Sequence, residues 1–251
     1  MQRFFLNFSY DGSAYHGWQI QPNAISVQEV MTSVLRTLFE KDLDIIAAGR
    51  TDSGVHALAM TAHFDTAYPI ENPDAMANKL DRMLPADIAV RSLRRVRPGA
   101  HARFDAISRT YQYKIILQKD PFLRDYSLRL YYEPDVEAMN KAADRLLEYS
   151  DFTSFSKVHT DVKTFICKVT HARWERRGSE LIFTIQADRF LRNMVRAIVG
   201  SLLEVGKGRI DEEGFCRIIE ARDRCRAGTS MPAHALYLTE VKYSDDLYLI
   251  G

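Results

Sequence analysis

The sequence has few cysteines, no long hydrophobic run and almost no net charge. Its three cysteines, Cys167, Cys216 and Cys225, are odd in number and form no CxxC pair, which argues against a disulfide framework and against a zinc site. No apolar run approaches the roughly 20 residues that a membrane-spanning helix needs. The N-terminal residues lack the apolar stretch of a signal peptide. We therefore expect a cytoplasmic protein with no membrane segment.

The near-neutral charge bears on nucleic acid as a partner. Lys and Arg number 34 against 33 for Asp and Glu, and dedicated nucleic-acid binders are often strongly basic. Basic residues nevertheless gather in two stretches, each of which is either a solvated face or a phosphate-binding surface. The first comprises Arg91, Arg94, Arg95, Arg97, His101, Arg103 and Arg109, and the second Arg173, Arg176, Arg177, Arg189, Arg192 and Arg196.

Hydrophobic patterning predicts an α+β fold with two halves. In the first half, strands are expected over 3–10, 43–48, 58–64 and 88–96, with helices starting after Ser26 and Asn72. This β-α-β-β-α-β order is that of a ferredoxin-like domain, with a mostly antiparallel sheet and helices on one face.

The second half reduces to the same order with extra elements. Strands are expected over 108–117, 127–132, 164–174, 180–188 and 236–243, and helices over 136–147, 189–205 and 211–221. We therefore predict two ferredoxin-like domains, 1–104 and 105–251, packed rigidly because no Gly/Ser-rich linker separates them. A central cleft at their junction is the expected place for a site.

The most distinctive stretch is Gly-Arg-Thr-Asp-Ser-Gly-Val-His-Ala, residues 49–57, between two predicted strands. It places Asp52 in a tight, Gly-flanked connection, which is either a simple turn or a site. Arg50 and His56 lie close to it in sequence. His56 either contacts a phosphate or packs in the turn, whereas His63 is expected in the core of the next strand. Residues 10–19 form a second Gly-punctuated loop that mixes aromatic and polar side chains.

Two further residues stand out in the second half. Tyr111 shares a strand face with Tyr113, so it is either a half-buried sheet residue or a platform for a base. Arg196 lies on a predicted helix that is largely apolar, where an Arg is costly unless it is paired with a carboxylate; the alternative is a solvated stripe with Arg192.

These motifs resemble those of the tRNA pseudouridine synthase A family. Residues 49–57 resemble its signature loop, residues 10–19 its opening motif, and residues 194–200, Met-Val-Arg-Ala-Ile-Val-Gly, its Arg-bearing helix. The similarity runs from Tyr10 to Leu238. Departures are Ser53 where the family has Ala, Asp81 where it often has Asn, and Ala235 where it commonly has Gly.

The resemblance implies an isomerase that converts uridine to pseudouridine at positions 38, 39 and 40 of the tRNA anticodon stem-loop. Asp52 would be the catalytic carboxylate, Arg196 its partner and Tyr111 the contact to the target uracil, with Arg50 and His56 as further substrate-binding residues. It also implies a homodimer. The reaction oxidises nothing and releases no group, so we expect no cofactor and no metal. Asp52 could attack covalently or remove a sugar proton, and both roles stay open.

Two other classes of protein are compatible with parts of the pattern. A catalytically silent RNA-binding module of two ferredoxin-like domains would keep Tyr111 and the Arg clusters without needing Asp52. A small-molecule hydrolase with a carboxylate nucleophile would not need the Arg clusters. Asp52 together with Arg196 favours the isomerase.

Overall fold

The computed structural model describes residues 1–157 and 164–249. Contacts within the chain divide it into two units. Unit 1 contains residues 1–107 and 238–249, and unit 2 contains residues 108–237 apart from the undescribed segment. The predicted domains, 1–104 and 105–251, stay a prediction; the units differ from them in grouping residues 105–107 and 238–249 with the first half.

Unit 1 follows a β-α-β-β-α-β order. Its elements are β1 (Gln2–Tyr10), α1 (Val27–Leu38), β2 (Ile46–Ala47), β3 (His56–Thr66), α2 (Pro73–Met83) and β4 (Ile88–Val96). Strand β1 lies between β4 and β3, β2 pairs with β3, and each of these pairs is antiparallel. The sheet is therefore open and antiparallel, although β2 is shorter than the expected 43–48.

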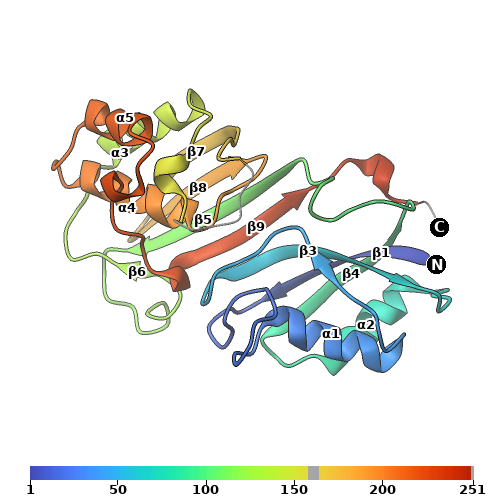
Figure 1. Ribbon diagram of the computed structural model, residues 1–251. Coiled ribbons are helices and arrows are strands. Elements are labelled where there is room, and N and C mark those ends of the chain that lie inside the picture. Colours follow the sequence, from blue (N-terminus) through green and yellow to red (C-terminus); the bar gives the residue numbers. More distant parts are fainter. Residues whose placement is uncertain (158–163, 250–251) are drawn as a thin grey trace. The chain divides into compact units, whose positions relative to one another are not determined.

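The helices of unit 1 begin where local capping chemistry predicts. The Ser26 hydroxyl accepts the Glu29 N–H at 3.2 Å, and the Asn72 side chain accepts the Ala75 N–H at 2.9 Å with Pro73 at the first helical position. Helices α1 and α2 lie side by side against the sheet (Figure 1).

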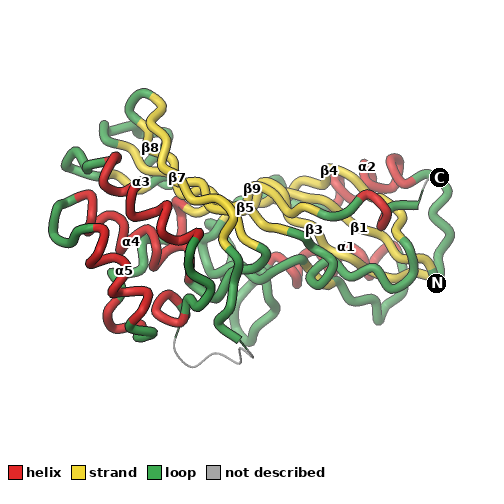
Figure 2. The backbone as a smooth tube through the Cα atoms, turned by 90° about the horizontal axis from the view of Figure 1, so that it is seen from above, coloured by secondary structure: helices red, strands yellow, loops and turns green. Residues whose placement is uncertain are grey.

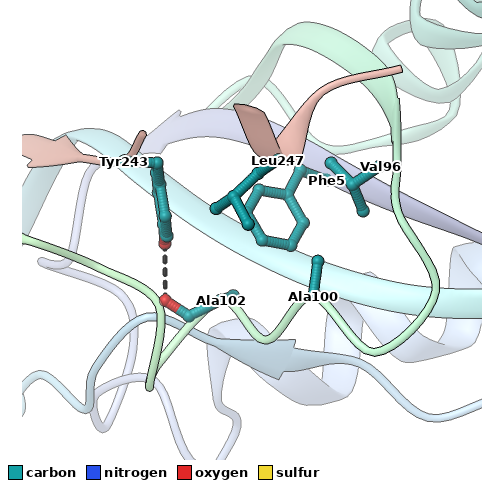
Figure 3. Close-up of a cluster of buried hydrophobic side chains, with 6 residues drawn as sticks. All are labelled: Phe5, Val96, Ala100, Ala102, Tyr243 and Leu247. Atoms are coloured by element: carbon teal, nitrogen blue, oxygen red, sulfur yellow. Dashed lines mark hydrogen bonds between the residues drawn. The ribbon is translucent and has the colours of Figure 1, made fainter. Parts of the chain in front are cut away.

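The other face of this sheet packs against the C-terminal residues. Because side chains alternate along a strand, Phe5 points away from the face that carries Phe4. Phe5 joins a buried cluster with Val96, Ala100, Ala102, Tyr243 and Leu247 (Figure 3). Backbone bonds also join Arg97 N–H to the Leu247 carbonyl at 2.9 Å and Leu249 N–H to the Arg95 carbonyl at 3.1 Å. Residues 243–249 thus pack on β1 and extend along the end of β4.

Unit 2 combines β-strands with a group of helices. Its elements are β5 (Ser108–Ile116), β6 (Leu128–Arg129), α3 (Val136–Asp144), β7 (Val169–Arg177), β8 (Glu180–Ala187), α4 (Met194–Gly206) and α5 (Glu212–Glu220). β8 lies between β5 and β7 with antiparallel pairing, and β6 pairs parallel to β5. Helices α3, α4 and α5 pack together (Figure 2). β9 (Leu236–Lys242) begins in unit 2 and continues into unit 1.

One helix start differs from the prediction. The sequence pattern placed the start of a helix at Arg189, but α4 begins at Met194. Asn193 takes the left-handed conformation with φ 67°, which interrupts a right-handed helix at this point. Arg192 therefore precedes the helix. Among the described residues, no helix has the length and apolar character to cross a membrane.

Candidate active site

Asp52 lies in the connection between β2 and β3, as the sequence predicted. We call residues 48–55 the Asp52 loop. Within it the Val55 N–H donates to the Asp52 carbonyl at 3.1 Å, and Gly54 has φ 78°. A positive φ at the third residue of a four-residue turn is the mark of a type II turn and favours glycine. The Asp52 side chain is half-buried. Local turn chemistry therefore fixes the backbone that carries this carboxylate.

The loop of residues 10–19 holds the Asp52 loop on both sides of Asp52. Before Asp52, the Thr51 carbonyl accepts the Trp18 N–H at 3.3 Å. After it, the Tyr15 carbonyl accepts the Gly54 N–H at 3.3 Å and the Ser53 hydroxyl at 3.3 Å. Two of these three bonds join main-chain atoms, so they hold the backbone at each side of the carboxylate.

A side-chain bond adds to this contact. The hydroxyl groups of Tyr10, at the end of β1, and Thr51 share a hydrogen bond of 2.8 Å. Since the Tyr10 ring is buried, this bond ties the Asp52 loop to the end of a core strand.

Two glycines allow the loops to approach this closely. A Cβ on Gly12 would lie 2.1 Å from the Val55 carbonyl oxygen. A Cβ on Gly17, whose φ is +87°, would lie 2.3 Å from the Thr51 carbonyl oxygen and 3.1 Å from the carbonyl carbon of Asp52. The glycines that the sequence showed as loop punctuation are thus required by backbone contact at the candidate site.

Asp87 anchors the 10–19 loop from a third segment. Its carboxylate accepts the Tyr15 hydroxyl at 2.7 Å, and its carbonyl accepts the Asp11 N–H at 2.9 Å. Burial, followed by the hydrogen bond to Asp87, raises the pKa of Tyr15 well above its usual value, so Tyr15 stays a donor. Sequence reasoning missed Asp87, because the contact is long-range and no motif marks it.

His56 lies beneath the two loops rather than on the surface. Only 2% of its surface is exposed, its Nδ1 accepts the Gly12 N–H at 3.1 Å, and the Asp11 carboxylate lies 3.1 Å from the same nitrogen. One nitrogen can serve only one of these partners at a time: unprotonated it accepts from Gly12, and protonated it donates to Asp11. Either bond ties β3 to the 10–19 loop. Arg50 is exposed, and its role in binding stays a prediction.

His63 and Asp81 behave as structural residues. His63 is buried in β3 and its Nδ1 accepts the Ala102 N–H at 3.1 Å, so the expectation of a core histidine is confirmed. Asp81 accepts the Val90 N–H at 2.8 Å through a side-chain oxygen that Asn would also offer.

Tyr111 lies in β5 of unit 2, opposite Ile185 of β8. Its ring meets Phe190 edge-on, with centroids 5.1 Å apart and planes at 86°. Tyr113, two residues on and on the same face, is fully buried and donates its hydroxyl to the Pro232 carbonyl at 2.9 Å. The half-buried Tyr111 is therefore a sheet residue with a fixed ring, and its contact with a base stays a prediction.

Arg196 lies in the first turn of α4, in unit 2. Its Nε donates to the Met231 carbonyl at 2.6 Å, and its own carbonyl accepts the Met231 N–H at 3.1 Å. The side chain is half-buried, while most of α4 around it is fully buried. The first of these bonds fixes the Nε atom of the guanidinium group. Its pairing with Asp52, which lies in unit 1, stays a prediction.

Within residues 1–157 and 164–249, no three His, Cys, Asp or Glu side chains gather as a metal site. The protein has a mixed α/β fold with mostly antiparallel strand pairing, and it carries an acidic side chain on a loop that a second loop holds. Comparison with known proteins identifies the family. The profile of the family described as tRNA pseudouridine synthase matches residues 7–105 and 142–244.

Full-length relatives agree with this match. A Bacteroides thetaiotaomicron protein named tRNA pseudouridine synthase A is 55% identical over 251 residues, covering 99% of this chain and 93% of the relative. Proteins with the same name from Bacteroides fragilis and Porphyromonas gingivalis are 55% and 50% identical, covering 99% of this chain and 99% and 100% of the relatives. The chain belongs to the tRNA pseudouridine synthase family, and it is an isomerase of that family.

Proposed function

We propose that this chain converts uridine to pseudouridine at positions 38, 39 and 40 of the tRNA anticodon stem-loop, with Asp52 acting on a flipped-out uridine. The observation that carries the proposal is the fixed position of Asp52, whose neighbours on both sides are bonded to the 10–19 loop. A loop restrained in this way can hold a reacting group in one geometry without support from substrate. Membership of the tRNA pseudouridine synthase family supplies the substrate class and the reaction.

The chemistry needs one acidic residue and careful positioning. The bond between N1 of uracil and C1′ of the ribose breaks, the ring turns, and C5 joins the same C1′. C5 loses a proton and N1 gains one, so the product is an isomer and no co-reactant is consumed. Asp52 acts in one of two ways: its carboxylate attacks C1′, or it removes a proton from C2′. Both require an ionised carboxylate at a fixed distance from the sugar.

The remaining site residues follow from the same proposal. Arg196 pairs with Asp52 and keeps it ionised. The hydrogen bond from Arg196 Nε to the Met231 carbonyl, which orients the guanidinium group, supports that role. Tyr111 stacks on or beside the target uracil, and Arg50 and His56 contribute to substrate binding. The two halves are ferredoxin-like domains around a central cleft, and the protein works in the cytoplasm as a homodimer. The β-α-β-β-α-β order of unit 1 supports the domain assignment.

Substitution of Asp52 tests the proposal. Wild type, Asp52→Asn and Ser53→Ala are incubated with unmodified tRNA bearing U38, U39 and U40, and pseudouridine is mapped by chemical labelling. Asp52→Asn keeps the shape of the side chain and should bind tRNA without modifying it. Ser53→Ala is the matched control, because it changes the neighbouring residue and removes only one 3.3 Å bond to Tyr15. It should stay active.

Three outcomes would contradict parts of the proposal. Activity in Asp52→Asn would remove Asp52 from the chemistry. Pseudouridine at other positions would leave the isomerase in place and overturn the proposed target. Wild-type binding without any pseudouridine would favour the silent RNA-binding module.

Deuterium at C2′ of the target uridine separates the two roles of Asp52. A primary isotope effect on the single-turnover rate indicates proton removal from the sugar, whereas an unchanged rate indicates covalent attack at C1′.

A further inference from the structure

A loop of unit 1 presents one aromatic ring to solvent. Phe104 lies between β4 and β5, and 75% of its surface is exposed. Single exposed apolar residues are common on protein surfaces and need no explanation by themselves. Phe104 differs because several specific hydrogen bonds hold the backbone beneath it.

The backbone around Phe104 is fixed by its own neighbours. The His101 N–H donates to the Asp105 carboxylate at 2.7 Å, and the Asp105 N–H donates back to the His101 carbonyl at 3.0 Å. The Nδ1 atom of His101 accepts the Arg103 N–H at 3.1 Å and the Phe104 N–H at 3.4 Å. Residues 101–105 therefore form a closed turn with Phe104 at its tip.

This turn is also tied to the core of unit 1. The Ala102 N–H donates to His63 Nδ1 at 3.1 Å, and the Ala102 carbonyl accepts the Tyr243 hydroxyl at 2.6 Å (Figure 3). Arg3 donates to the Ala100 carbonyl at 2.9 Å. The loop is therefore held by β3 through His63, by the C-terminal segment through Tyr243 and by β1 through Arg3. The backbone that carries the Phe104 ring thus has a defined position.

Aromatic rings continue from Phe104 into the sheet. The Phe104 ring lies 4.3 Å from the His101 ring at 35°, and the His101 ring lies 4.5 Å from that of His63. Burial, followed by the charge of Arg3, lowers the pKa of His101, which agrees with a neutral ring that accepts through Nδ1. One side of the Phe104 ring is thus supported by a ring, while most of its surface faces solvent.

We propose that Phe104 is a stacking platform for an unpaired base of the tRNA substrate. Every base has a π face, so an exposed and immobilised ring binds unstacked nucleotides whatever their sequence. The Arg103 guanidinium lies over the ring, 5.7 Å from its centroid, and adds positive charge that attracts a polyanionic ligand. The inference rests on the proposed function for its ligand and adds a binding contact that is separate from Asp52.

Substitutions of Phe104 test the platform. We expect Phe104→Ala to raise the Kd for unmodified tRNA by about 5- to 140-fold at fixed salt, the range found for loss of one stacked base. The kcat at saturating tRNA should not change, because the contact serves binding and not the reacting atoms. Phe104→Trp should restore binding. Phe122→Ala is the matched control, since Phe122 in unit 2 is 86% exposed.

The Trp variant supplies a readout that a structural role would not change. The native Trp18 and Trp174 also emit, so wild type is titrated in parallel, and the emission that Phe104→Trp adds to that of wild type reports on the loop tip. We expect tRNA to quench this emission at a concentration that matches the Kd, whereas Phe122→Trp should show no such quenching.

Several results would overturn the inference. One is a Phe104→Ala variant that is folded, as judged by unchanged circular dichroism, and that binds tRNA with the wild-type Kd. Another is quenching of Phe104→Trp that follows protein concentration without RNA, which would assign the ring to a protein contact. If wild type forms pseudouridine while Phe104→Ala binds normally, the platform alone fails. If wild type neither binds nor modifies tRNA, the proposed function fails and the platform with it.

Discussion

Gly17→Ala probes how far the 10–19 loop determines the position of Asp52. The new Cβ would lie 2.3 Å from the Thr51 carbonyl oxygen, well inside the 3.0 Å that real Cβ contacts respect. The Asp52 loop, the 10–19 loop or both must therefore shift by about 0.7 Å, the difference between these two distances. The same Cβ would lie 3.1 Å from the Asp52 carbonyl carbon, so the shift would occur at the candidate catalytic residue.

The magnitude has two parts. Alanine at φ +87° costs about 1–2 kcal/mol because its Cβ crowds the following carbonyl in the left-handed region. The collision with Thr51 adds a cost of similar size, so we expect the free energy of unfolding to fall by about 2–4 kcal/mol. A misplacement approaching 1 Å can cost about 100-fold in rate, and we expect kcat to fall by about 10- to 100-fold.

Gly99→Ala is the matched control. Gly99 has φ +85° and nothing within 4 Å of the Cβ position, so its substitution carries the left-handed cost alone. Urea unfolding gives both stabilities, and single-turnover pseudouridine formation below the unfolding transition gives both rates. If folded Gly17→Ala reacts as fast as Gly99→Ala, contact between the two loops does not set the position of Asp52, and the reasoning is refuted.

Two further predictions concern unit 1. Tyr15→Phe removes a hydroxyl that donates to the Asp87 carboxylate at 2.7 Å, and it should lower the free energy of unfolding by about 1.5–3 kcal/mol. Asp87→Asn keeps an acceptor for this hydroxyl and should lose less stability. Equal losses of the two variants in urea unfolding would contradict the role of this bond. Burial lowers the pKa of His63 to about 4, so the unfolded chain binds the proton first as pH falls below about 6.5, and stability is lost toward pH 4. Between pH 7 and pH 5 the free energy of unfolding should fall by about 2 kcal/mol because of this residue. The loss is measured as the difference between wild type and His63→Gln, which keeps an acceptor for the Ala102 N–H. If stability falls with pH in parallel in the two proteins, the prediction is refuted.

The features predictable from sequence were those fixed by local chemistry. Ser26 and Asn72 cap helices through bonds to residues three positions away, so each helix start could be read directly. The turn that carries Asp52 depends on a glycine with positive φ and was equally readable. Leu43 and Ile45 gave a strand-like pattern because they are buried, but only Ile46–Ala47 pairs with β3, since burial alone does not require pairing.

Long-range contacts were beyond the sequence. Nothing near Asp87 shows that it binds Tyr15, and nothing in residues 243–249 shows that they pack on Phe5. The late start of α4 depends on the left-handed Asn193, which periodicity does not reveal. The loop that holds Asp52 could therefore be recognised, whereas most of the contacts that restrain it could not.

The discontinuity of unit 1 has a consequence for synthesis of the protein. Residues 238–249 leave the ribosome after all of unit 2, yet they supply Tyr243 and Leu247 to the cluster around Phe5. Unit 2 is continuous in sequence and can begin to fold first, while unit 1, which contains Asp52, also needs residues 238–249. A chain cut short after unit 2 would leave Phe5 and the end of β4 uncovered. Folding of unit 1 is thereby coupled to the synthesis of residues 238–249.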